Sequence, residues 1–256
     1  MSSSTGPART DVVLVTGGGR GIGAATALLA ARRGYRVGVN YRADEASATA
    51  VVEAIRSAGG TAVAIRADVT RTAEVERLFA TVDAELGPLT GLVNNAGTLE
   101  RQCRLEDLDE DRLTRIWAAN ITGPFLCAAQ AVRRMSTRHG GRGGAIVNVS
   151  SAASRLGAPN EYVDYAAAKG AVDSMTRGLA LEVAAEGIRV NAVRPGLIRT
   201  GIHALGGEPG RVDRVAPELP MRRGGTAEEV AESILFLLSP AASYTTGAFL
   251  DIAGGR

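Results

Sequence analysis

The feature that most constrains the fold is an apolar run that leads through a glycine-rich turn into a helical pattern. Residues 11–15 (DVVLV) predict a short strand buried on both faces. TGGGRGIG follows at positions 16–23, and a helical pattern then continues to residue 33 before Gly34. A glycine turn between a strand and a helix brings unpaired helix N–H groups close to a phosphate. The stretch therefore predicts a dinucleotide-binding unit of a parallel α/β sheet.

The glycine spacing leaves an alternative open. Gly17, Gly21 and Gly23 do not follow the GxGxxG spacing of the dehydrogenase fingerprint, so an ordinary tight turn competes with phosphate binding. The context favours the phosphate site, because glycine at these positions lets the backbone approach a ligand and lets the helix pack on the strand.

The rest of the chain repeats the alternation of strands and helices. Strands are expected at residues 35–39, 61–67, 89–93, 144–149, 188–193 and 246–252, with helices at 45–58, 70–86, 107–138, 165–186 and 226–238. This order predicts one α/β domain over residues 11–256, a doubly wound (Rossmann) seven-stranded parallel sheet with helices on both faces. Residues 1–10 are small and polar, and we expect a disordered tail there.

Two segments depart from regular structure. Asn120 and Gly123-Pro124 fall inside the long helical stretch 107–138, which predicts a kink with a freed carbonyl that can hold a water. Residues 201–224, the lid segment, are punctuated by glycine and proline, with a short helix expected at 211–215. A long irregular stretch inside a domain is typical of a substrate loop or lid.

Composition excludes several classes of function. The net charge of +2 gives no reason to expect nucleic acid or an anionic membrane as a partner. Cys103 and Cys127 form no CxxC motif or Cys/His cluster, so no metal is predicted and a reducing compartment is expected. No apolar run approaches the roughly 20 residues of a membrane span, and we expect a cytoplasmic protein.

Tyr165 and Lys169 are four positions apart on a predicted helix and therefore share one face. A free tyrosine has a pKa of about 10, and lowering it by three units requires roughly 4 kcal/mol, which a cation about 4 Å away supplies. The pair is thus a candidate acid/base. Taken alone, a surface tyrosine near a lysine is the commoner interpretation.

The end of the second strand indicates which dinucleotide is bound. The sequence there is Asn40-Tyr41-Arg42, with no acidic residue before Asp44, and Arg20 in the glycine turn adds a second cation. An arginine favours the 2′-phosphate of NADP(H), whereas an acidic residue favours NAD(H). We expect NADP(H), with NAD(H) as the second choice; solvated surface arginines are the alternative interpretation.

The singled-out polar groups follow the carboxyl ends of predicted strands, where such sheets bind ligands. They are Thr16, Arg42, Asp68, Asn94, Ser151 and Thr200. Asp68 is ambiguous, because it can accept from an adenine amino group or cap the helix that follows. A nucleotide at the glycine turn would bring its nicotinamide to Ser151, Tyr165 and Lys169.

These motifs together resemble the short-chain dehydrogenase/reductase family over residues 10–256. They are TGGGRGIG (16–23), NNAG (94–97), Asn120, Ser151, Tyr165-x-x-x-Lys169 and PGLIRT (195–200), in that order. The resemblance is strongest to bacterial members similar to 3-oxoacyl-carrier-protein reductase and glucose dehydrogenase. It implies that Tyr165 is the general acid/base and that Lys169 lowers its pKa and holds the nicotinamide ribose. It also implies that Ser151 binds the substrate oxygen and that Asn120 holds a water that links Lys169 to solvent.

The resemblance further implies a homotetramer, or a homodimer, and a set of NAD(P)H contacts. The expected contact residues are Gly17, Arg20, Gly21, Ile22, Gly23, Tyr41, Arg42, Asp68, Val69, Asn94, Ala96, Gly97, Tyr165, Lys169, Pro195, Gly196, Ile198 and Thr200. Ser151 precedes Tyr165 by 14 residues where the family usually has 13. Ser150 is its rival, but strand alternation turns the two serines to opposite faces, which favours Ser151.

The predicted function is reversible hydride transfer between NADPH and a ketone or secondary alcohol. Its substrate is expected to be a 3-oxoacyl group, a sugar or a small carbonyl compound. Lid residues His203, Arg211 and Arg214 are candidates to meet a polar or anionic substrate, with solvated loop charges as the alternative. A catalytically idle nucleotide-binding protein on the same scaffold is the alternative function. A serine hydrolase is disfavoured, because no GxSxG surrounds Ser151.

Overall fold

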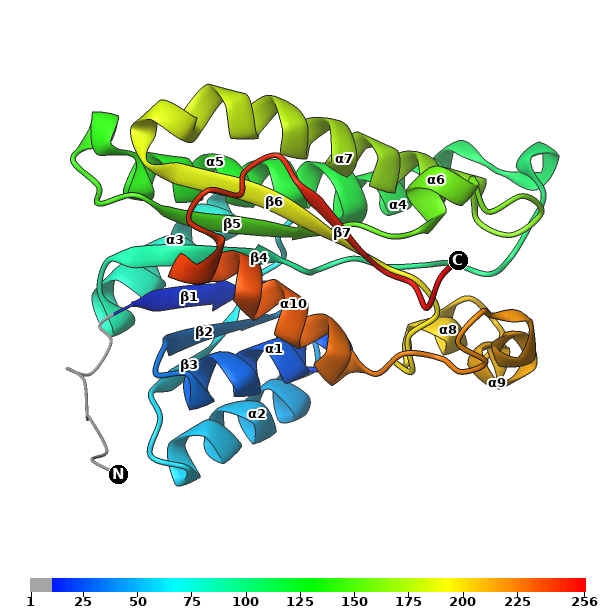
Figure 1. Cartoon of the computed structure of the whole chain (residues 1–256), viewed down its shortest axis with the longest axis horizontal. Coiled ribbons are helices and arrows are strands. Elements are labelled where there is room, and N and C mark those ends of the chain that lie inside the picture. Colours follow the sequence, from blue (N-terminus) through cyan, green and yellow to red (C-terminus); the bar gives the residue numbers. More distant parts are fainter. Residues whose placement is uncertain (1–10) are drawn as a thin grey trace.

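The computed structural model describes residues 11–256, so the predicted disordered tail at 1–10 lies outside the described residues. Seven strands form one sheet in the order β3-β2-β1-β4-β5-β6-β7, and every neighbouring pair is parallel (Figure 1). The strands are β1 (Val12–Val15), β2 (Arg36–Tyr41), β3 (Ala62–Arg66), β4 (Leu89–Asn94), β5 (Gly144–Val149), β6 (Ile188–Pro195) and β7 (Phe249–Ile252). The predicted seven-stranded parallel sheet is confirmed. The strand order reverses direction between β1 and β4, and such a switch point opens a ligand crevice at the carboxyl ends.

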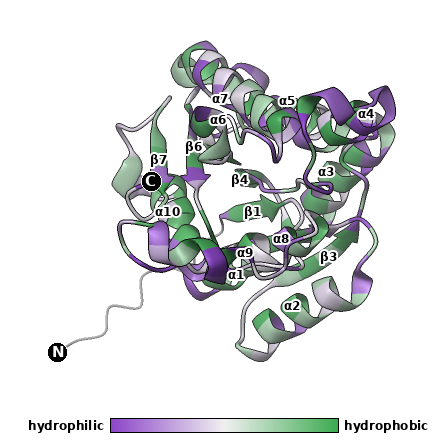
Figure 2. Cartoon of the chain, turned by 90° about the vertical axis from the view of Figure 1, so that its right-hand side faces the viewer, coloured by the Kyte–Doolittle hydropathy of each residue, from purple (hydrophilic) through white to green (hydrophobic). Residues whose placement is uncertain are grey.

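Helices cover both faces of the sheet. α1 (Gly21–Arg32), α2 (Glu45–Ser57) and α10 (Ala227–Leu238) contribute to one apolar cluster with the strands. α3 (Thr72–Leu86), α5 (Gly123–Met135) and α7 (Val163–Val183) contribute to the other. In Figure 2 the strands between these two layers are coloured mainly as hydrophobic. The doubly wound arrangement is therefore the predicted one.

Strand β1 shows why its residues have to be apolar. All four of its side chains are completely buried: Val13 and Val15 belong to the α1/α10 cluster, and Val12 and Leu14 belong to the α3/α5 cluster. Each fully buried valine or leucine contributes roughly 1.5–3 kcal/mol. A polar residue anywhere in this strand would lie in an apolar layer, whichever face it occupied.

The long helical stretch 107–138 is broken where the sequence predicts a kink. A short 3₁₀ turn (Leu105–Asp107) leads to α4 (Glu110–Trp117), and a π-helical turn (Ala118–Thr122) joins α4 to α5. Pro124 lies in the first turn of α5, directly after the π turn, and its missing N–H leaves a main-chain carbonyl of that turn without a helical donor. The kink puts the buried side chain of Asn120 at the junction of the two helices.

The lid segment contains more helix than the sequence suggests. The predicted short helix is α9 (Arg211–Val215), and an unpredicted one, α8 (Ile202–Leu205), precedes it. Leu197, Val212, Val215 and Leu219 form a small separate core beneath the segment. α10 begins with the predicted capping box between Thr226 and Glu229. A further short helix, α6 (Ala153–Leu156), lies between β5 and α7.

No helix in the part of the chain that the structure describes is long and apolar enough to cross a membrane.

Candidate active site

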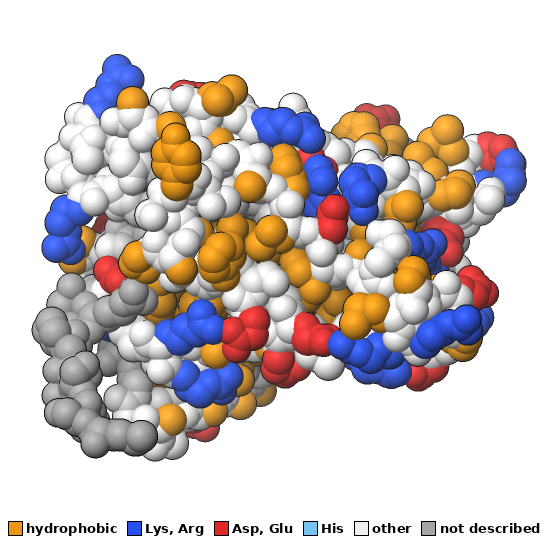
Figure 3. Space-filling view, in the orientation of Figure 1, with side chains coloured by type: hydrophobic (Ala, Val, Ile, Leu, Met, Phe, Trp, Pro, Cys, Tyr) orange, Lys and Arg blue, Asp and Glu red, His pale blue; other side chains and the backbone are white. Residues whose placement is uncertain are grey.

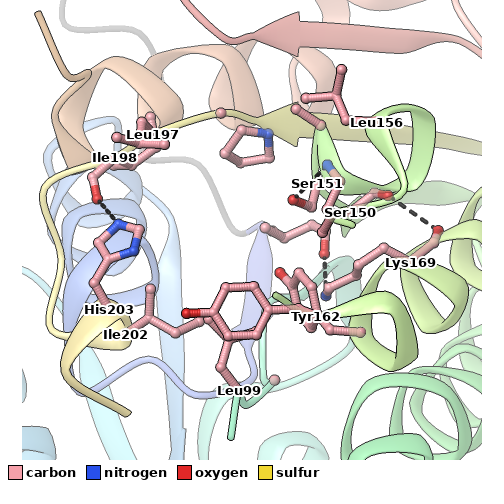
Figure 4. Close-up of a pocket in the computed structure, with 18 of the residues that line it drawn as sticks. Leu99, Ser150, Ser151, Leu156, Tyr162, Lys169, Leu197, Ile198, Ile202 and His203 are labelled. Atoms are coloured by element: carbon pink, nitrogen blue, oxygen red, sulfur yellow. Dashed lines mark hydrogen bonds between the residues drawn. The ribbon is translucent and has the colours of Figure 1, made fainter. Parts of the chain in front are cut away.

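A cavity of about 420 Å³ lies beyond the carboxyl ends of β5 and β6 (Figure 4). We call it the tyrosine cavity. Asn120, Ser151, Tyr165 and Lys169 all line it, although they come from the π turn, the end of β5 and helix α7. The fold thus gathers the four predicted catalytic side chains on one surface.

The two neighbouring serines have different environments. Ser150 is 2% exposed, and its hydroxyl donates to the Lys169 carbonyl oxygen at 3.3 Å. Ser151 is partly exposed, and its hydroxyl accepts from the Ala153 N–H at 3.1 Å. The hydroxyl proton of Ser151 is therefore directed into the cavity, where it is donated to Tyr165 or to a ligand, whereas Ser150 is occupied with α7.

The acidity of Tyr165 differs from the sequence expectation. Burial raises the pKa of Tyr165 to about 12, and the hydrogen bond to Ser151 lowers it only in part. The Lys169 ammonium lies 5.4 Å from the centre of the Tyr165 ring, over its face. In the protein alone, desolvation therefore dominates, and the pKa of Tyr165 is raised where the sequence predicts that it is lowered.

Lys169 is the only lysine in the chain, and it is 3% exposed. Its Nζ donates to the Val149 carbonyl oxygen at 2.9 Å, which turns the ammonium toward β5. Burial lowers the pKa of Lys169 to about 8, and the Asp173 carboxylate one turn further along α7 raises it. A lysine with such a pKa exchanges protons near neutral pH, which a free lysine does not.

The side chain of Asn120 is buried and makes three hydrogen bonds to the protein. Its Nδ2 donates to the carbonyl oxygens of Thr98 (3.0 Å) and Ile116 (2.9 Å), and its Oδ1 accepts from the Thr98 N–H at 3.2 Å. These bonds tie the π turn to the loop after β4. A methyl group at Gly97 would lie 2.7 Å from Asn120 Oδ1 and 3.6 Å from Lys169 Nζ, so only glycine fits between them.

A second cavity of about 320 Å³, the glycine cavity, adjoins the first. The two share Ile22, Asn95, Gly97, Thr200 and Ile202 and form one continuous cleft. Predicted contact residues that line the glycine cavity are Gly17, Arg20, Gly21, Ile22, Tyr41, Arg42, Asp68, Val69, Ala96, Gly97 and Thr200. Pro195, Gly196 and Ile198 line the tyrosine cavity.

The glycine turn is built to accept an anion. No side chain caps α1, and its first turn contains no acidic residue. Gly21, at the start of the helix, lines the cavity with φ of 53°, a conformation that favours glycine. Free N–H groups at a helix N-terminus and the positive end of the helix dipole stabilise a phosphate. The cleft therefore fits a dinucleotide with its pyrophosphate at α1.

Two of the predicted contact residues, Gly23 and Asn94, line neither cavity. A methyl group on Gly23 would collide with the Gly17 carbonyl oxygen and lie 2.6 Å from Asn95 Nδ2, so this glycine permits close packing. Asn94 is 3% exposed and donates to Pro124 and Asn148. The side chain that reaches the cleft is the next one, Asn95, which the expected contact set omits.

Asn95 and Asn40 hold the glycine turn in place. Asn95 Nδ2 donates to the carbonyl oxygens of Thr16 (2.9 Å) and Gly17 (3.1 Å). Asn40 Oδ1 accepts from the Gly17 N–H at 3.2 Å, and its Nδ2 donates to Ala67 at 3.0 Å. The sequence identifies Asn40 only as part of a strand end, because no local pattern indicates that it bridges three strand ends.

At the far end of the glycine cavity, Arg20 and Arg42 are exposed and form no ion pair within residues 11–256. Asp44 lies in the same wall, where Arg20 contributes to lowering the pKa of its carboxyl group. Asp68 uses one carboxylate oxygen to accept from the N–H and hydroxyl of Thr70. The N-cap of α3 is Arg71, so Asp68 orders the turn before the helix and still lines the cavity.

The charges of the lid segment are paired with one another and with the neighbouring loops. Arg211 is 7% exposed and donates to Glu161 at 2.5 Å and to Glu208 at 3.2 Å. Arg214 binds Glu208 as well, and His203 Nε2 is 2.9 Å from the Ile198 carbonyl oxygen. Figure 3 shows basic and acidic side chains side by side over this part of the surface. None of His203, Arg211 and Arg214 therefore offers the unpaired positive charge that an anionic substrate would need.

The fold and cleft are those of an oxidoreductase of the Rossmann type, with a tyrosine and a lysine in the same cavity. Residues 17–256 match the family described as "Enoyl-(Acyl carrier protein) reductase". The chain belongs to the short-chain dehydrogenase/reductase family and is an oxidoreductase of that type. Members of this family in general use NAD(P) cofactors.

Individual relatives cover nearly the whole chain. It is 58% identical to "Uncharacterized oxidoreductase YgfF" of Escherichia coli over 96% of this chain and 99% of that protein. It is 40% identical to "3-oxoacyl-[acyl-carrier-protein] reductase" of Synechocystis over 96% of both chains. A solved double mutant of a Serratia marcescens short-chain dehydrogenase/reductase has a TM-score of 0.89 at 33% identity, over 98% of this chain and 99% of that one.

Proposed function

We propose that the chain catalyses reversible, NADPH-dependent hydride transfer between the nicotinamide and a ketone or secondary alcohol. The observation that carries this proposal is the continuous cleft, in which a phosphate-binding turn leads directly to Ser151, Tyr165 and Lys169. A bound nicotinamide would supply the hydride to a carbonyl carbon or accept it from an alcohol. Everything else that the reaction needs is supplied by side chains of this cleft.

Ser151 and Tyr165 act on the substrate oxygen. Both hydroxyls reach the same cavity, and the Ser151 side chain already hydrogen-bonds Tyr165. Two donors on one oxygen stabilise the negative charge that develops there, and Tyr165 then donates its proton. In the reverse direction Tyr165 accepts the proton of the alcohol.

Lys169 and Asn120 return the proton to Tyr165. Lys169, with its pKa lowered to about 8, both gives up and regains a proton near neutral pH. Both N–H donors of the Asn120 amide are bonded to the carbonyl groups of Thr98 and Ile116, and its oxygen accepts from the Thr98 N–H. We therefore propose that Asn120 acts through the π turn that it stabilises, whose main-chain carbonyl groups hold the water that leads to solvent.

The central test is the oxidation of NADPH in the presence of a panel of carbonyl compounds. The Tyr165→Phe variant is expected to bind NADPH with wild-type affinity and to lose at least about 10²-fold in kcat, because it lacks the proton donor. Near-wild-type turnover by this variant would contradict the assignment. A wild-type protein that binds NADPH tightly and reduces no compound would instead support the idle nucleotide-binding alternative.

The preference for NADPH rests on Arg20 and Arg42, which are both exposed and form no salt bridge within the described residues, although Asp44 lies in the same cavity wall as Arg20. A guanidinium binds the 2′-phosphate of NADPH and gains nothing from the ribose hydroxyl of NADH. Arg42→Ala is expected to raise the Kd of NADPH about tenfold and leave that of NADH unchanged. Arg142→Ala, at an exposed arginine that lines neither cavity, is the matched control.

We infer a small-molecule carbonyl substrate, with 3-oxoacyl groups, sugars and simple ketones as candidates. The name of the Synechocystis relative supports the first of these.

We also propose a homotetramer, because Trp117, Phe125 and Leu181 leave apolar surface exposed on α4, α5 and α7. Analytical ultracentrifugation tests this, and a monomer would contradict it.

The free thiols Cys103 and Cys127 support a reducing, cytoplasmic location, which cell fractionation tests.

A further inference from the structure

Tyr162 is the one residue of the tyrosine cavity that carries a buried polar group with no assigned use. It is 5% exposed, and its hydroxyl makes no hydrogen bond within the described residues. A buried hydroxyl without a partner costs roughly 1–3 kcal/mol, which phenylalanine at the same position would avoid. The hydroxyl therefore has to be explained by something other than packing.

Its place in the fold connects this hydroxyl with the substrate. Tyr162 is the N-cap residue of α7 and precedes Tyr165 by three positions, so the two rings stand about one helical turn apart. Figure 4 shows Tyr162 on the cavity wall between Lys169 and the lid residues Ile202 and His203. Its hydroxyl lies under Gly206 of the lid, where a methyl group on that glycine would collide with it.

The surroundings of Tyr162 are apolar or electrically balanced. Leu99, Leu156, Leu197 and Ile202 line the same cavity. The Arg211 guanidinium lies 5.6 Å from the centre of the Tyr162 ring, but Glu161 and Glu208 neutralise it. Arg256 also lines the cavity and is exposed, so solvent screens its charge. An uncharged oxygen is therefore the acceptor that suits this wall best.

We propose that Tyr162 is a specificity-determining residue whose hydroxyl donates to a second, uncharged oxygen of the substrate. The substrate class is then a neutral ketone with an apolar body and a second carbonyl or hydroxyl group a few bonds from the reacting one. This inference rests on the proposed function, because it places the reacting carbonyl at Tyr165. A site that hydrogen-bonds a substrate group discriminates against the analogue that lacks it.

Three small ketones of nearly equal shape test the inference with NADPH. They are 2,5-hexanedione, which has a second neutral oxygen, 2-hexanone, which lacks it, and 4-oxopentanoate, which replaces the second ketone by a carboxylate. The wild-type kcat/KM for 2,5-hexanedione is expected to exceed that for each of the other two ketones by about tenfold, because one additional hydrogen bond contributes about that factor. In Tyr162→Phe that preference over 2-hexanone should disappear, with 2-hexanone turnover unchanged.

A second variant perturbs the hydroxyl without altering the tyrosine. Gly206→Ala places a methyl group against the Tyr162 oxygen and is expected to lower the preference for 2,5-hexanedione as well. Gly210→Ala is the matched control, because this glycine also lies in the lid segment with a negative φ, lines neither cavity, and has no atom within 4 Å of the added methyl group. Circular dichroism and melting temperature confirm that each variant is folded.

The outcomes separate the two proposals. A wild-type enzyme that reduces none of the three ketones contradicts the proposed function and this inference with it. Turnover with an unchanged preference in Tyr162→Phe contradicts this inference alone. An equal loss for all three ketones also contradicts it, because Tyr162 is then only a packing residue.

Discussion

Lys169→Met is expected to increase the resistance of the protein to unfolding at neutral pH while it removes the cation of the proposed acid/base pair. The ammonium group is 3% exposed, and burial lowers the pKa of Lys169 from 10.5 to about 8. The unfolded chain holds this proton below pH 10.5, and the folded protein holds it only below about pH 8. The unfolded state therefore binds more protons in that window, and the stability of the wild-type protein rises as the pH rises through it.

The size of the effect follows from the pKa difference. The shift of 10.5 minus about 8 corresponds to roughly 3 kcal/mol of destabilisation, fully present below pH 8 and reduced to about 1.4 kcal/mol at pH 9.5. Methionine fills a similar volume without the charge. The substitution also removes the hydrogen bond to the Val149 carbonyl oxygen, which lowers the free energy of unfolding by roughly 1–3 kcal/mol at any pH. The stability of Lys169→Met relative to wild type should thus fall by about 2 kcal/mol between pH 7 and 9.5.

Urea unfolding of both proteins at pH 7 and 9.5 measures this difference. Tyr165 is present in both proteins, so the titration of its phenol largely cancels. Because Lys169 is the only lysine, selective ¹³Cε-lysine labelling gives a single side-chain NMR signal whose titration reports the pKa directly. A titration midpoint near 10.5, or a stability difference that is equal at both pH values, would refute the reasoning.

Three further predictions concern packing, capping and catalysis. Gly23→Ala should lower the free energy of unfolding, measured in urea, by about 3 kcal/mol or more, because the added methyl group collides with the backbone. Gly178→Ala, on the open side of α7, should instead raise it by about 1 kcal/mol. Equal effects of the two substitutions would contradict this. Thr226→Ala should cost about 1 kcal/mol in the same assay by removing the capping box of α10, and no loss would argue against it. Ser151→Ala should lower kcat about 10²-fold and Ser150→Ala far less; the reverse order would exchange their roles.

Local patterns were sufficient for the architecture. The apolar run at 12–15 is buried on both faces, and the capping box at Thr226 starts a helix where the sequence indicated one. Burial of parallel strands and satisfaction of helix ends are short-range requirements, so they leave a signature in consecutive residues. α8 escaped prediction, because its four residues lie between glycines and have no periodicity of their own.

Site geometry was less accessible. Gly23 and Asn94 belong to recognisable sequence motifs, but they support the glycine turn and the sheet instead of lining the cleft. Tyr162 carries no motif, and only the fold shows that its hydroxyl is buried without a partner. Which side chain of a motif faces a ligand depends on packing from distant segments, and single-sequence patterns do not contain that information.

The sequence by itself determined the parallel sheet, the glycine turn at the start of α1 and the helical spacing of Tyr165 and Lys169. Each depends on residues within a few positions of one another. The tertiary structure decided the acidity of that pair. Burial, which involves many segments at once, raises the pKa of Tyr165 and lowers that of Lys169, and both directions oppose the charged forms. Desolvation is a property of the assembled interior, and for that reason no run of residues could reveal it.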